Sequence, residues 1–292
     1  MSQVLNDLIK LLKLERLDDF LFRGQNQDLG LRQVFGGQVV AQALSAAIQV
    51  APSDRILHSC HAYFLSPGDS LNPIIYDVET LREGRSFTAL RVKAIQHNQP
   101  ICHVTASFQV SETGFDHQSR MPQVDSPDTF VSESLVMQKL AKHLPEPLRD
   151  KLTAERPFDI RTQYINNPFQ GIKLPAEQYT WVKANGTAPL AQHIQQCLLA
   201  YFSDFHPLLT ALHPHEKGLM QAGMKVATID HSIWFHRPFD LNDWLLYAIE
   251  SNNAYGARGL SRGQIFDRQG RLIATTQQEG LIRYSAEKQE KK

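Results

Sequence analysis

Two stretches of the sequence repeat one pattern of residues at a constant separation. "YFLSPGDSLNPIIYDVE" at 63–79 aligns without a gap with "WFHRPFDLNDWLLYAIE" at 234–250. The identical positions lie 171 residues apart and pair Phe64, Pro67, Asp69, Tyr76 and Glu79 with Phe235, Pro238, Asp240, Tyr247 and Glu250. Repetition at a fixed distance is typical of duplicated structural units. The chain is therefore predicted to contain two copies of one fold.

A segment with helical periodicity precedes each copy. Apolar residues recur at i, i+3, i+4, i+7 and i+8 in both halves, at Val40, Ala43, Leu44, Ala47 and Ile48 and at Ile194, Cys197, Leu198, Tyr201 and Phe202. This spacing predicts a helix with one apolar stripe, which another part of the protein must cover.

Strand-like runs separated by turn signals follow each predicted helix. The first half has IIYDVETL, SFTALRVKAI, a turn at HNQP and ICHVTASFQV, and the second has LLYAIES, ARGLSRGQIF, a turn at DRQG and LIATTQQEGLI. Alternating apolar residues indicate strands with one buried face. The predicted class is α+β, with two units that each lay a helix on an antiparallel sheet.

Changes in composition predict the boundaries of these units. We expect an N-terminal unit at 1–112, a linker at 113–156, a C-terminal unit at 157–286 and a charged tail at 287–292. The linker begins with polar, proline-bearing sequence and continues with a short predicted helix near 132–144. Residues 1–22 place Leu5, Leu8 and Leu12 at helical spacing between charged residues. That pattern predicts an amphipathic helix and excludes a signal peptide or a membrane span.

Charge and cysteine content narrow the function classes. The chain has 30 basic and 30 acidic residues, so no surplus of positive charge points to nucleic acid. Cys60, Cys102 and Cys197 are odd in number and far apart, which argues against a disulfide framework or a cysteine-based zinc site. We therefore expect a cytoplasmic protein with no nucleic-acid or membrane partner.

The stretch "GLSRG" at 259–263 has the G-x-S-x-G spacing of a serine-hydrolase nucleophile elbow. Such an elbow connects a strand to a helix, and a histidine follows the serine later in the chain. The sequence after Ser261 instead predicts strand, turn and strand, and the last histidine is His236. The motif is therefore interpreted as strand sequence without a nucleophile.

Two further motifs carry a family resemblance, "LGLRQVFGGQVVAQAL" at 29–44 and "ATIDHSIWFHRPF" at 227–239. With them, nearly the whole chain resembles the bacterial acyl-CoA thioesterase II family. The resemblance implies a double hotdog fold, in which a curved antiparallel sheet wraps a long helix twice in one chain. It also implies hydrolysis of fatty acyl-CoA to free acid and CoA. A water-activating triad carries over to Asp204 in "YFSDFHPL", Thr228 in "VATIDHS" and Gln278 in "TTQQEG".

The three residues suit that chemistry, although each also has a structural interpretation. Asp204 falls at the edge of an apolar helix stripe, where burial would raise its pKa and make it a better base. Without the resemblance, a solvated aspartate at a helix end is the favoured interpretation. The Thr228 hydroxyl can hold a water, and the Gln278 amide can accept from that water or donate to an oxyanion. At the separation of 171 residues, Thr228 aligns with Leu57 and Gln278 with Ser107, so the first half is expected to lack this pair.

Other polar residues receive weaker assignments. Gly36-Gly37 opens the first helix, where free N–H groups could stabilise an oxyanion, but close packing of the helix on the sheet is favoured. The candidates for binding CoA phosphates are Arg32, Arg82, Arg85 and Arg258. His206, His213 and His215 are expected in a solvent loop, because their spacing matches no metal site. We expect neither a metal nor a cofactor.

Two alternatives to a medium- to long-chain acyl-CoA thioesterase remain open. The first is an enoyl-CoA hydratase or dehydratase on the same fold, which would pair Asp204 with His206, His231 or His58. The second is a non-catalytic acyl-CoA-binding protein. Self-association as a dimer or tetramer is expected, because hotdog sheets leave edges and faces to cover. The chain length of the preferred substrate and any regulation do not follow from the sequence.

Overall fold

The computed structural model describes residues 2–30, 33–141, 146–165 and 167–285; the predicted tail at 287–292 lies outside these ranges. Thirteen strands form one antiparallel sheet in the order β1-β2-β4-β5-β6-β3-β10-β13-β12-β11-β9-β8-β7. The strands are β1 (Glu15–Asp18), β2 (Leu21–Gly24), β3 (Arg55–Phe64), β4 (Ile74–Glu83), β5 (Phe87–Gln96), β6 (Gln99–Val110), β7 (Val131–Ser132), β8 (Phe158–Thr162), β9 (Glu177–Ala184), β10 (Met224–Phe235), β11 (Leu245–Tyr255), β12 (Arg258–Asp267) and β13 (Leu272–Tyr284).

The strand order confirms the duplication. From the central β3–β10 pair, the sheet continues outward as β6, β5 and β4 on one side and as β13, β12 and β11 on the other. The two repeated stretches occupy the same place in each half, at the end of the central strand and the start of the outer one. The central strands pair Asp230 with Tyr63 and Trp234 with Ser59. One continuous sheet therefore joins the two copies.

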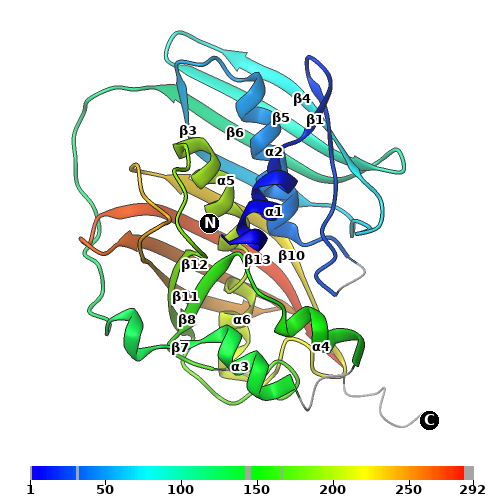
Figure 1. Cartoon of the computed structure of the whole chain (residues 1–292), viewed down its shortest axis with the longest axis vertical. Helices are drawn as coiled ribbons and strands as arrows, with labels where there is room; N and C mark the ends of the chain where they lie inside the picture. Colours follow the sequence, from blue (N-terminus) through cyan, green and yellow to red (C-terminus); the bar gives the residue numbers. More distant parts are fainter. Residues whose placement is uncertain (1, 31–32, 142–145, 166, 286–292) are drawn as a thin grey trace.

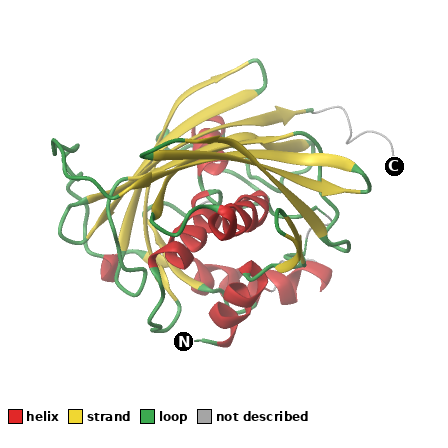
Figure 2. Ribbon diagram, turned by 90° about the horizontal axis from the view of Figure 1, so that it is seen from above, coloured by secondary structure: helices red, strands yellow, loops and turns green. Residues whose placement is uncertain are grey.

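The helices lie in the hollow of the curved sheet (Figure 2). They are α1 (Gln3–Leu12), α2 (Gly36–Val50), α3 (Glu133–Leu140), α4 (Glu146–Thr153), α5 (Gln192–Ser203) and α6 (Pro207–Leu212). The two long helices that the periodicity predicted are α2 and α5, and they pack against each other. No helix among the described residues is long and apolar enough to cross a membrane.

The prediction of one covered stripe per helix was too narrow. Residues from Gly37 to Leu44 in α2 and from Gln195 to Ser203 in α5 are all buried. Helix α2 packs on the sheet, and α5 reaches it through hydrogen bonds from Gln196 to the Leu57 carbonyl and from Tyr247 to the Ser203 carbonyl. The two helices also contact each other, and α1 contacts both. A helix that is covered from several directions is buried around its whole circumference.

The N-terminal helix is shorter than predicted. It ends at Leu12, and residues that were expected to extend it form β1 and β2. The turn at Asp19-Phe20 joins these strands, and Arg23 forms an ion pair with Glu15 across them. Phe22 is fully buried where β2 pairs with β4. Pairing at the sheet edge therefore outweighs the helical spacing after Leu12.

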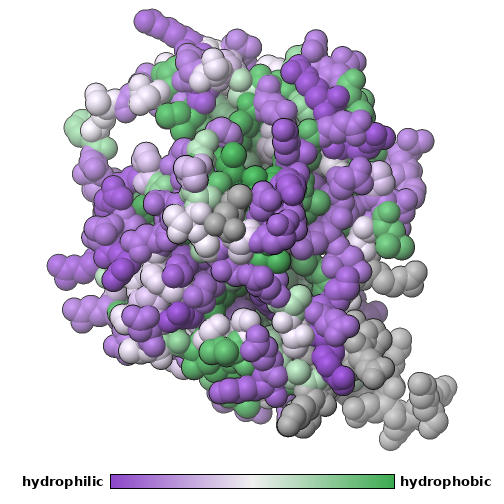
Figure 3. Space-filling model, in the orientation of Figure 1, coloured by the Kyte–Doolittle hydropathy of each residue, from purple (hydrophilic) through white to green (hydrophobic). Residues whose placement is uncertain are grey.

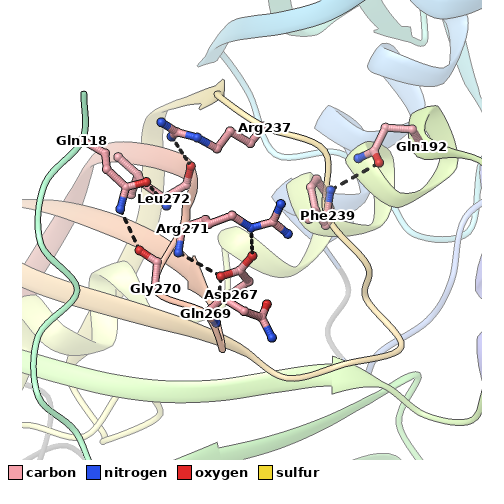
Figure 4. A network of polar contacts seen from close by, with 9 residues as sticks. All are labelled: Gln118, Gln192, Arg237, Phe239, Asp267, Gln269, Gly270, Arg271 and Leu272. Carbon is pink, nitrogen blue, oxygen red and sulfur yellow. Dashed lines mark hydrogen bonds and ion pairs between the residues drawn. The ribbon is translucent and has the colours of Figure 1, made fainter. Parts of the chain in front are cut away.

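The connecting segment between the halves runs along the outside of the molecule before it reaches α3 and α4 (Figure 1). Gln118 fastens it to the β12–β13 turn, donating to the Gly270 carbonyl at 2.7 Å and accepting from the Leu272 N–H at 3.0 Å (Figure 4). Further along, the Trp181 indole donates to the Asp125 carbonyl at 2.9 Å. The segment is thus attached to the C-terminal half of the sheet at two points.

Candidate active site

Three predicted site residues, far apart in the sequence, come together beside the long helices. Asp204 follows the last turn of α5, Thr228 lies on β10, and Gln278 lies on β13. The Thr228 hydroxyl donates to Asp204 Oδ1 at 3.2 Å, and Gln278 Nε2 donates to Thr228 Oγ1 at 3.2 Å. The side chains form one hydrogen-bonded series that ends on the carboxylate.

Asp204 occupies the position where α5 must end. Pro207 begins α6 three residues later, and proline cannot continue the preceding helix because it lacks an N–H and clashes with the turn before it. The Tyr247 hydroxyl donates to the Ser203 carbonyl at 3.1 Å, which gives one of the free carbonyls at the end of α5 a partner. Asp204 is therefore held in a short, braced connection between two helices.

A β-bulge turns Thr228 toward the site. The pairing of β10 with β13 shifts between Thr228 and Asp230, so Ile229 is an extra residue in the strand. Side chains of a regular strand alternate between its faces, and an extra residue reverses that alternation. The bulge places Thr228 on the same face as buried His231 and Ile233. Without it, Thr228 would face the outside of the sheet.

The first half has the same bulge without the polar residues. The pairing of β3 with β6 shifts between Leu57 and Ser59, at the positions that repeat Thr228 and Asp230. Cys60 then pairs with Ala106, as His231 pairs with Gln278. Gln278 therefore corresponds to Ala106, and the predicted match to Ser107 was wrong by one residue. The halves differ in length at the turn before the last strand, so the ungapped alignment fails there.

Burial changes the acidity of Asp204. Its removal from water raises the pKa of the carboxyl to about 7, while donation from Thr228, the Gly37 N–H and Gln278 opposes that rise. A carboxyl with a pKa near neutral pH is a suitable general base, because it is ionised in part and accepts a proton readily. The arrangement can therefore take a proton from a bound water.

The glycine pair that opens α2 lies directly against this carboxyl. A Cβ on Gly36 would be 2.7 Å from Asp204 Oδ2, and one on Gly37 would be 2.3 Å from the Tyr201 carbonyl oxygen. The expectation of close packing on the sheet holds for Gly36, which also faces Phe64 at the end of β3, but the nearest neighbour of each glycine is the end of α5. The contact also brings the positive end of the α2 dipole to the carboxylate.

The GLSRG stretch lies inside β12, as the strand interpretation predicted. Ser261 is buried, and its hydroxyl donates to the Pro207 carbonyl at 2.8 Å. A Cβ on Gly259 would be 2.7 Å from the Ala211 Cβ, and one on Gly263 would be 2.2 Å from the Tyr247 ring. The glycines of the motif therefore let α6 and the Tyr247 side chain of β11 pack closely against β12.

The three histidines that a hydratase or dehydratase could use have other partners than the carboxyl of Asp204. Among the described residues, His231 bonds Gln278 and Ser203, His206 bonds Glu133, and His58 bonds Ser107. The Asp–His pair that a hydratase or dehydratase would need is not formed in this part of the chain. The structure therefore does not favour that alternative.

Two histidine expectations were wrong. His206 and His213 were expected in a solvent loop, but both are buried where α6 packs on the sheet, and only His215 is exposed. His206 Nε2 lies 2.7 Å from Glu133 Oε1, and His213 Nδ1 lies 3.2 Å from the Pro175 carbonyl. Within the described residues, no group of three or more His, Cys, Asp or Glu side chains could hold a metal ion.

The candidate phosphate-binding arginines are scattered. Arg32 lies outside the described residues, and Arg82 and Arg85 are exposed near the β4–β5 turn. Arg258 forms an ion pair with Glu279 at 3.0 Å. These positions do not form one cluster, so they do not define a binding site for CoA phosphates.

Family models match both halves of the chain. The model described as acyl-CoA thioesterase matches residues 147–281, and the acyl-CoA thioesterase N-terminal domain matches residues 25–109. Acyl-CoA thioesterase 2 of Haemophilus influenzae is 73% identical over 98% of this chain and 100% of its own length. The chain belongs to the acyl-CoA thioesterase family. It is therefore a thioester hydrolase that acts on acyl-CoA.

Solved structures agree with this assignment. An acyl-CoA thioesterase II of Mycobacterium marinum is 32% identical, with a TM-score of 0.78 over 96% of this chain and 99% of that one. A hot dog fold protein of Alicyclobacillus acidocaldarius, 19% identical, has a TM-score of 0.72 over 98% of this chain and 100% of that one, which supports the fold alone. The thioesterase has the predicted α+β double hotdog fold.

The sequence did not single out two features of this thioesterase site. His231 was considered only as a partner for Asp204, yet it contacts Gln278 and Ser203. The bulge at Ile229 was not predicted. The sequence gives no clear signal for it, because Thr228, Asp230 and His231 are polar and leave no apolar alternation that the extra residue could interrupt.

Proposed function

We propose that the thioesterase hydrolyses medium- to long-chain fatty acyl-CoA with a water activated by Asp204, Thr228 and Gln278. One observation carries this proposal: a buried carboxyl whose pKa is near 7 ends a series of hydrogen bonds from the other two side chains. A second carboxylate or a histidine base is not needed for such a site. The neighbouring Gly37 N–H also donates to the carboxylate and favours its ionised form.

The proposed reaction has two steps. In the first, Asp204 takes a proton from the water while the water oxygen forms a bond to the thioester carbonyl carbon, giving a tetrahedral oxyanion. In the second, the oxyanion reforms the carbonyl and breaks the carbon–sulfur bond. The CoA thiolate then receives the proton from Asp204, and the products are the free acid and CoA. No bond forms between the protein and the acyl group.

The N-terminus of α2 is suited to the oxyanion. The first N–H groups of a helix have no partner within the helix, and the dipole favours negative charge there. Gly36 provides such a group, and a Cβ at this position would meet Asp204 Oδ2 at 2.7 Å and Phe64 Cζ at 3.0 Å. We assign the Gly36 N–H as an oxyanion donor, because only a glycine lets the start of α2 lie this close to Asp204 and Phe64.

The apolar surroundings support an acyl chain as the substrate group. The Phe35 ring lies 4.5 Å from the Phe205 ring and 5.1 Å from the Tyr201 ring, between the start of α2 and the end of α5. Phe64 faces the same glycine. Rings of this kind stabilise a hydrocarbon chain by removing it from water. The preference for medium to long chains is part of the proposal and is tested with a panel of chain lengths.

The test measures release of free CoA thiol from saturated acyl-CoAs by the wild type, Asp204→Asn and Ser261→Ala. We expect Asp204→Asn to lower kcat by about 10²- to 10⁴-fold, the usual contribution of a general base. Ser261→Ala should keep kcat close to wild type and lower the free energy of unfolding by about 1–3 kcal/mol, because the Pro207 carbonyl loses its buried donor.

Each outcome of this test has a distinct meaning. Retention of kcat in Asp204→Asn would contradict the proposed base. Loss of kcat in a folded Ser261→Ala protein would identify a serine mechanism instead. Binding of acyl-CoA without release of thiol from any chain length would favour the binding-protein alternative. A maximum of kcat/KM at short chains would contradict the proposed substrate range.

Two further expectations remain proposals. We propose that residues 113–156 link units at 1–112 and 157–286, because Gln118 and Trp181 attach this segment to the outside of the C-terminal half. A location in the cytoplasm also stays a prediction. Limited proteolysis within 113–126 tests the assignment of the linker. Fractionation of cells, followed with an antibody against the chain, tests the cytoplasmic location.

A further inference from the structure

The network around Asp204 extends beyond the three proposed catalytic residues. His231 is fully buried on β10, next to Gln278 on β13. Its Nδ1 lies 2.7 Å from Gln278 Oε1, and its Nε2 lies 2.8 Å from Ser203 Oγ. Ser203 directly precedes Asp204 in the chain. The network therefore begins and ends on neighbouring residues and forms a closed ring through three elements.

The chemistry of each contact gives this ring a direction. An amide oxygen can only accept, so the proton of the His231 ring must lie on Nδ1 for the contact with Gln278 Oε1 to be a hydrogen bond. Burial lowers the pKa of His231 to about 4, so the ring is neutral at pH 7 and Nε2 carries a lone pair. The single proton of the Ser203 hydroxyl then goes to Nε2 at 2.8 Å and not to the Ala200 carbonyl oxygen, which lies farther from Ser203 Oγ at 3.0 Å.

We infer that His231 is a positioning residue, which fixes the amide of Gln278 so that its N–H faces Thr228 and the Thr228 hydroxyl faces Asp204. This inference rests on the proposed roles of those three residues. Every donor in the series then points toward the carboxylate, from Ser203 through His231, Gln278 and Thr228 to Asp204.

The opposite orientation of the amide would disable the site. If Gln278 turned its oxygen toward Thr228, the Thr228 hydroxyl would donate to that oxygen instead of to Asp204. The carboxylate would lose a donor that stabilises its ionised form. The water would no longer be held in a fixed orientation by Thr228 and Asp204. The His231 Nδ1–H opposes this rotation because it would then face the amide N–H group.

The first half of the chain shows what the same position does without this role. Cys60 occupies the place of His231 on β3, and Ala106 occupies that of Gln278. Both are fully buried, like His231. The fold therefore accepts a small apolar side chain at this point of the sheet, so packing alone does not require an imidazole there.

Two isosteric substitutions separate the roles of the ring nitrogens. In His231→Asn, the amide N–H occupies the place of Nδ1–H and can still donate to Gln278. In His231→Gln, the longer side chain places its amide near Nε2 and leaves Gln278 Oε1 without a donor. We expect His231→Gln to lower kcat by about 10- to 100-fold with little change in KM, as expected for misplaced catalytic groups. His231→Asn should retain most of the wild-type kcat.

A pH profile distinguishes positioning from a purely structural role. In His231→Gln the ionised carboxylate of Asp204 loses support, so the acidic limb of kcat/KM should move to higher pH, whereas in His231→Asn it should stay near the wild-type position. Cys60→Ala, a buried change at the repeated position, is the matched control and should leave both kcat and the limb unchanged. Thermal unfolding of all three variants reports whether each one folds.

The tautomer of His231 can be observed independently of activity. In protein with ¹⁵N-labelled histidine, the ring signals of His231 should show the proton on Nδ1 in the wild type. Ser203→Ala removes the donor to Nε2 and should weaken that preference. A proton on Nε2 in the wild type would overturn the inference.

Failure of the inference and failure of the proposed function remain distinguishable. Wild-type kcat and pH profile in a folded His231→Gln protein, together with an inactive Asp204→Asn, would overturn only the role of His231. An active Asp204→Asn would overturn the proposed mechanism, whatever the tautomer of His231. Equal losses of kcat in His231→Asn and His231→Gln would also contradict the inference, because the Nδ1–H donor would then have no special part.

Discussion

The carboxyl of Asp204 combines two properties that normally oppose each other. It is buried to 8% exposure, yet three donors contact its ionised form. Burial prevails and raises the pKa to about 7. The sequence predicted the direction of this change from the edge of a helix stripe, but not the donors, because Gly37 and Gln278 are distant in the chain and reach the carboxyl only after folding.

The pH dependence of catalysis follows from this pKa. A general base must be ionised, so kcat/KM should rise with pH through a midpoint of about 7, set by Asp204, and level off above it. Tyr247 and Cys102 also face this carboxyl, but burial raises the pKa of each above its usual value, so neither titrates in this range. A midpoint below 5 in a pH series of CoA release would contradict the assignment.

The contribution of Asp204 to the free energy of unfolding should fall as the pH rises, whereas kcat/KM should increase. Because the pKa of Asp204 is raised on folding, the folded chain binds more protons than the unfolded chain between about pH 4 and 7. The contribution of Asp204 to the free energy of unfolding is therefore greatest below pH 4 and falls as the pH rises to 7. Asp204→Asn should be more stable than the wild type at pH 8, because each tenfold weakening of the acid on folding costs the ionised chain about 1.4 kcal/mol. Urea unfolding at pH 4.5 and 8 measures the difference, which should shrink at the lower pH.

Helices and strands were predicted with unequal success. Periodicity located α2 and α5, and turn signals located the strands from β4 to β6 and from β11 to β13. The polarity of the strands could not reveal β1 and β2, because β1 is exposed along its whole length and has no buried face to detect. The bulges in β3 and β10 also escaped prediction, since one extra residue changes the face of a side chain without changing the composition.

The contact between the ends of α2 and α5 leaves no room for a side chain at Gly37. A Cβ on Gly37 would meet the Tyr201 carbonyl oxygen at 2.3 Å and the Phe35 ring at 2.5 Å, and a backbone atom cannot move aside as a side-chain end can. We expect Gly37→Ala to separate the helix ends, to lower kcat by about 100-fold or more, and to destabilise the fold by about 1–3 kcal/mol.

Gly114→Ala is the matched control for this prediction, because a Cβ there would meet nothing within 4 Å. Both variants are compared by CoA release and by thermal unfolding. A Gly37→Ala protein with wild-type kcat would show that the helix ends do not need this close approach.

We expect copies of the protein to associate with one another. The helical face is predominantly hydrophilic, with apolar side chains in separate patches (Figure 3). On β3, by contrast, Ile56 and Tyr63 are 51% and 56% exposed. Large contiguous patches of exposed apolar side chains commonly mark contacts with another chain. Light scattering should give a dimer or tetramer of the 33.1 kDa chain, and a stable monomer at all concentrations would contradict this prediction.

The shared position of the site has a consequence for how such a gene can change. Gly36 and Gly37 come from the first copy, and Asp204, Thr228 and Gln278 from the second. Neither copy encodes the whole proposed centre, so we expect that splitting the reading frame would leave two inactive products. The first copy has Leu57 and Ala106 in place of the proposed polar pair, so we expect each polypeptide to hydrolyse one acyl-CoA at a time. On the proposed mechanism, duplication doubled the scaffold but not the number of reaction centres.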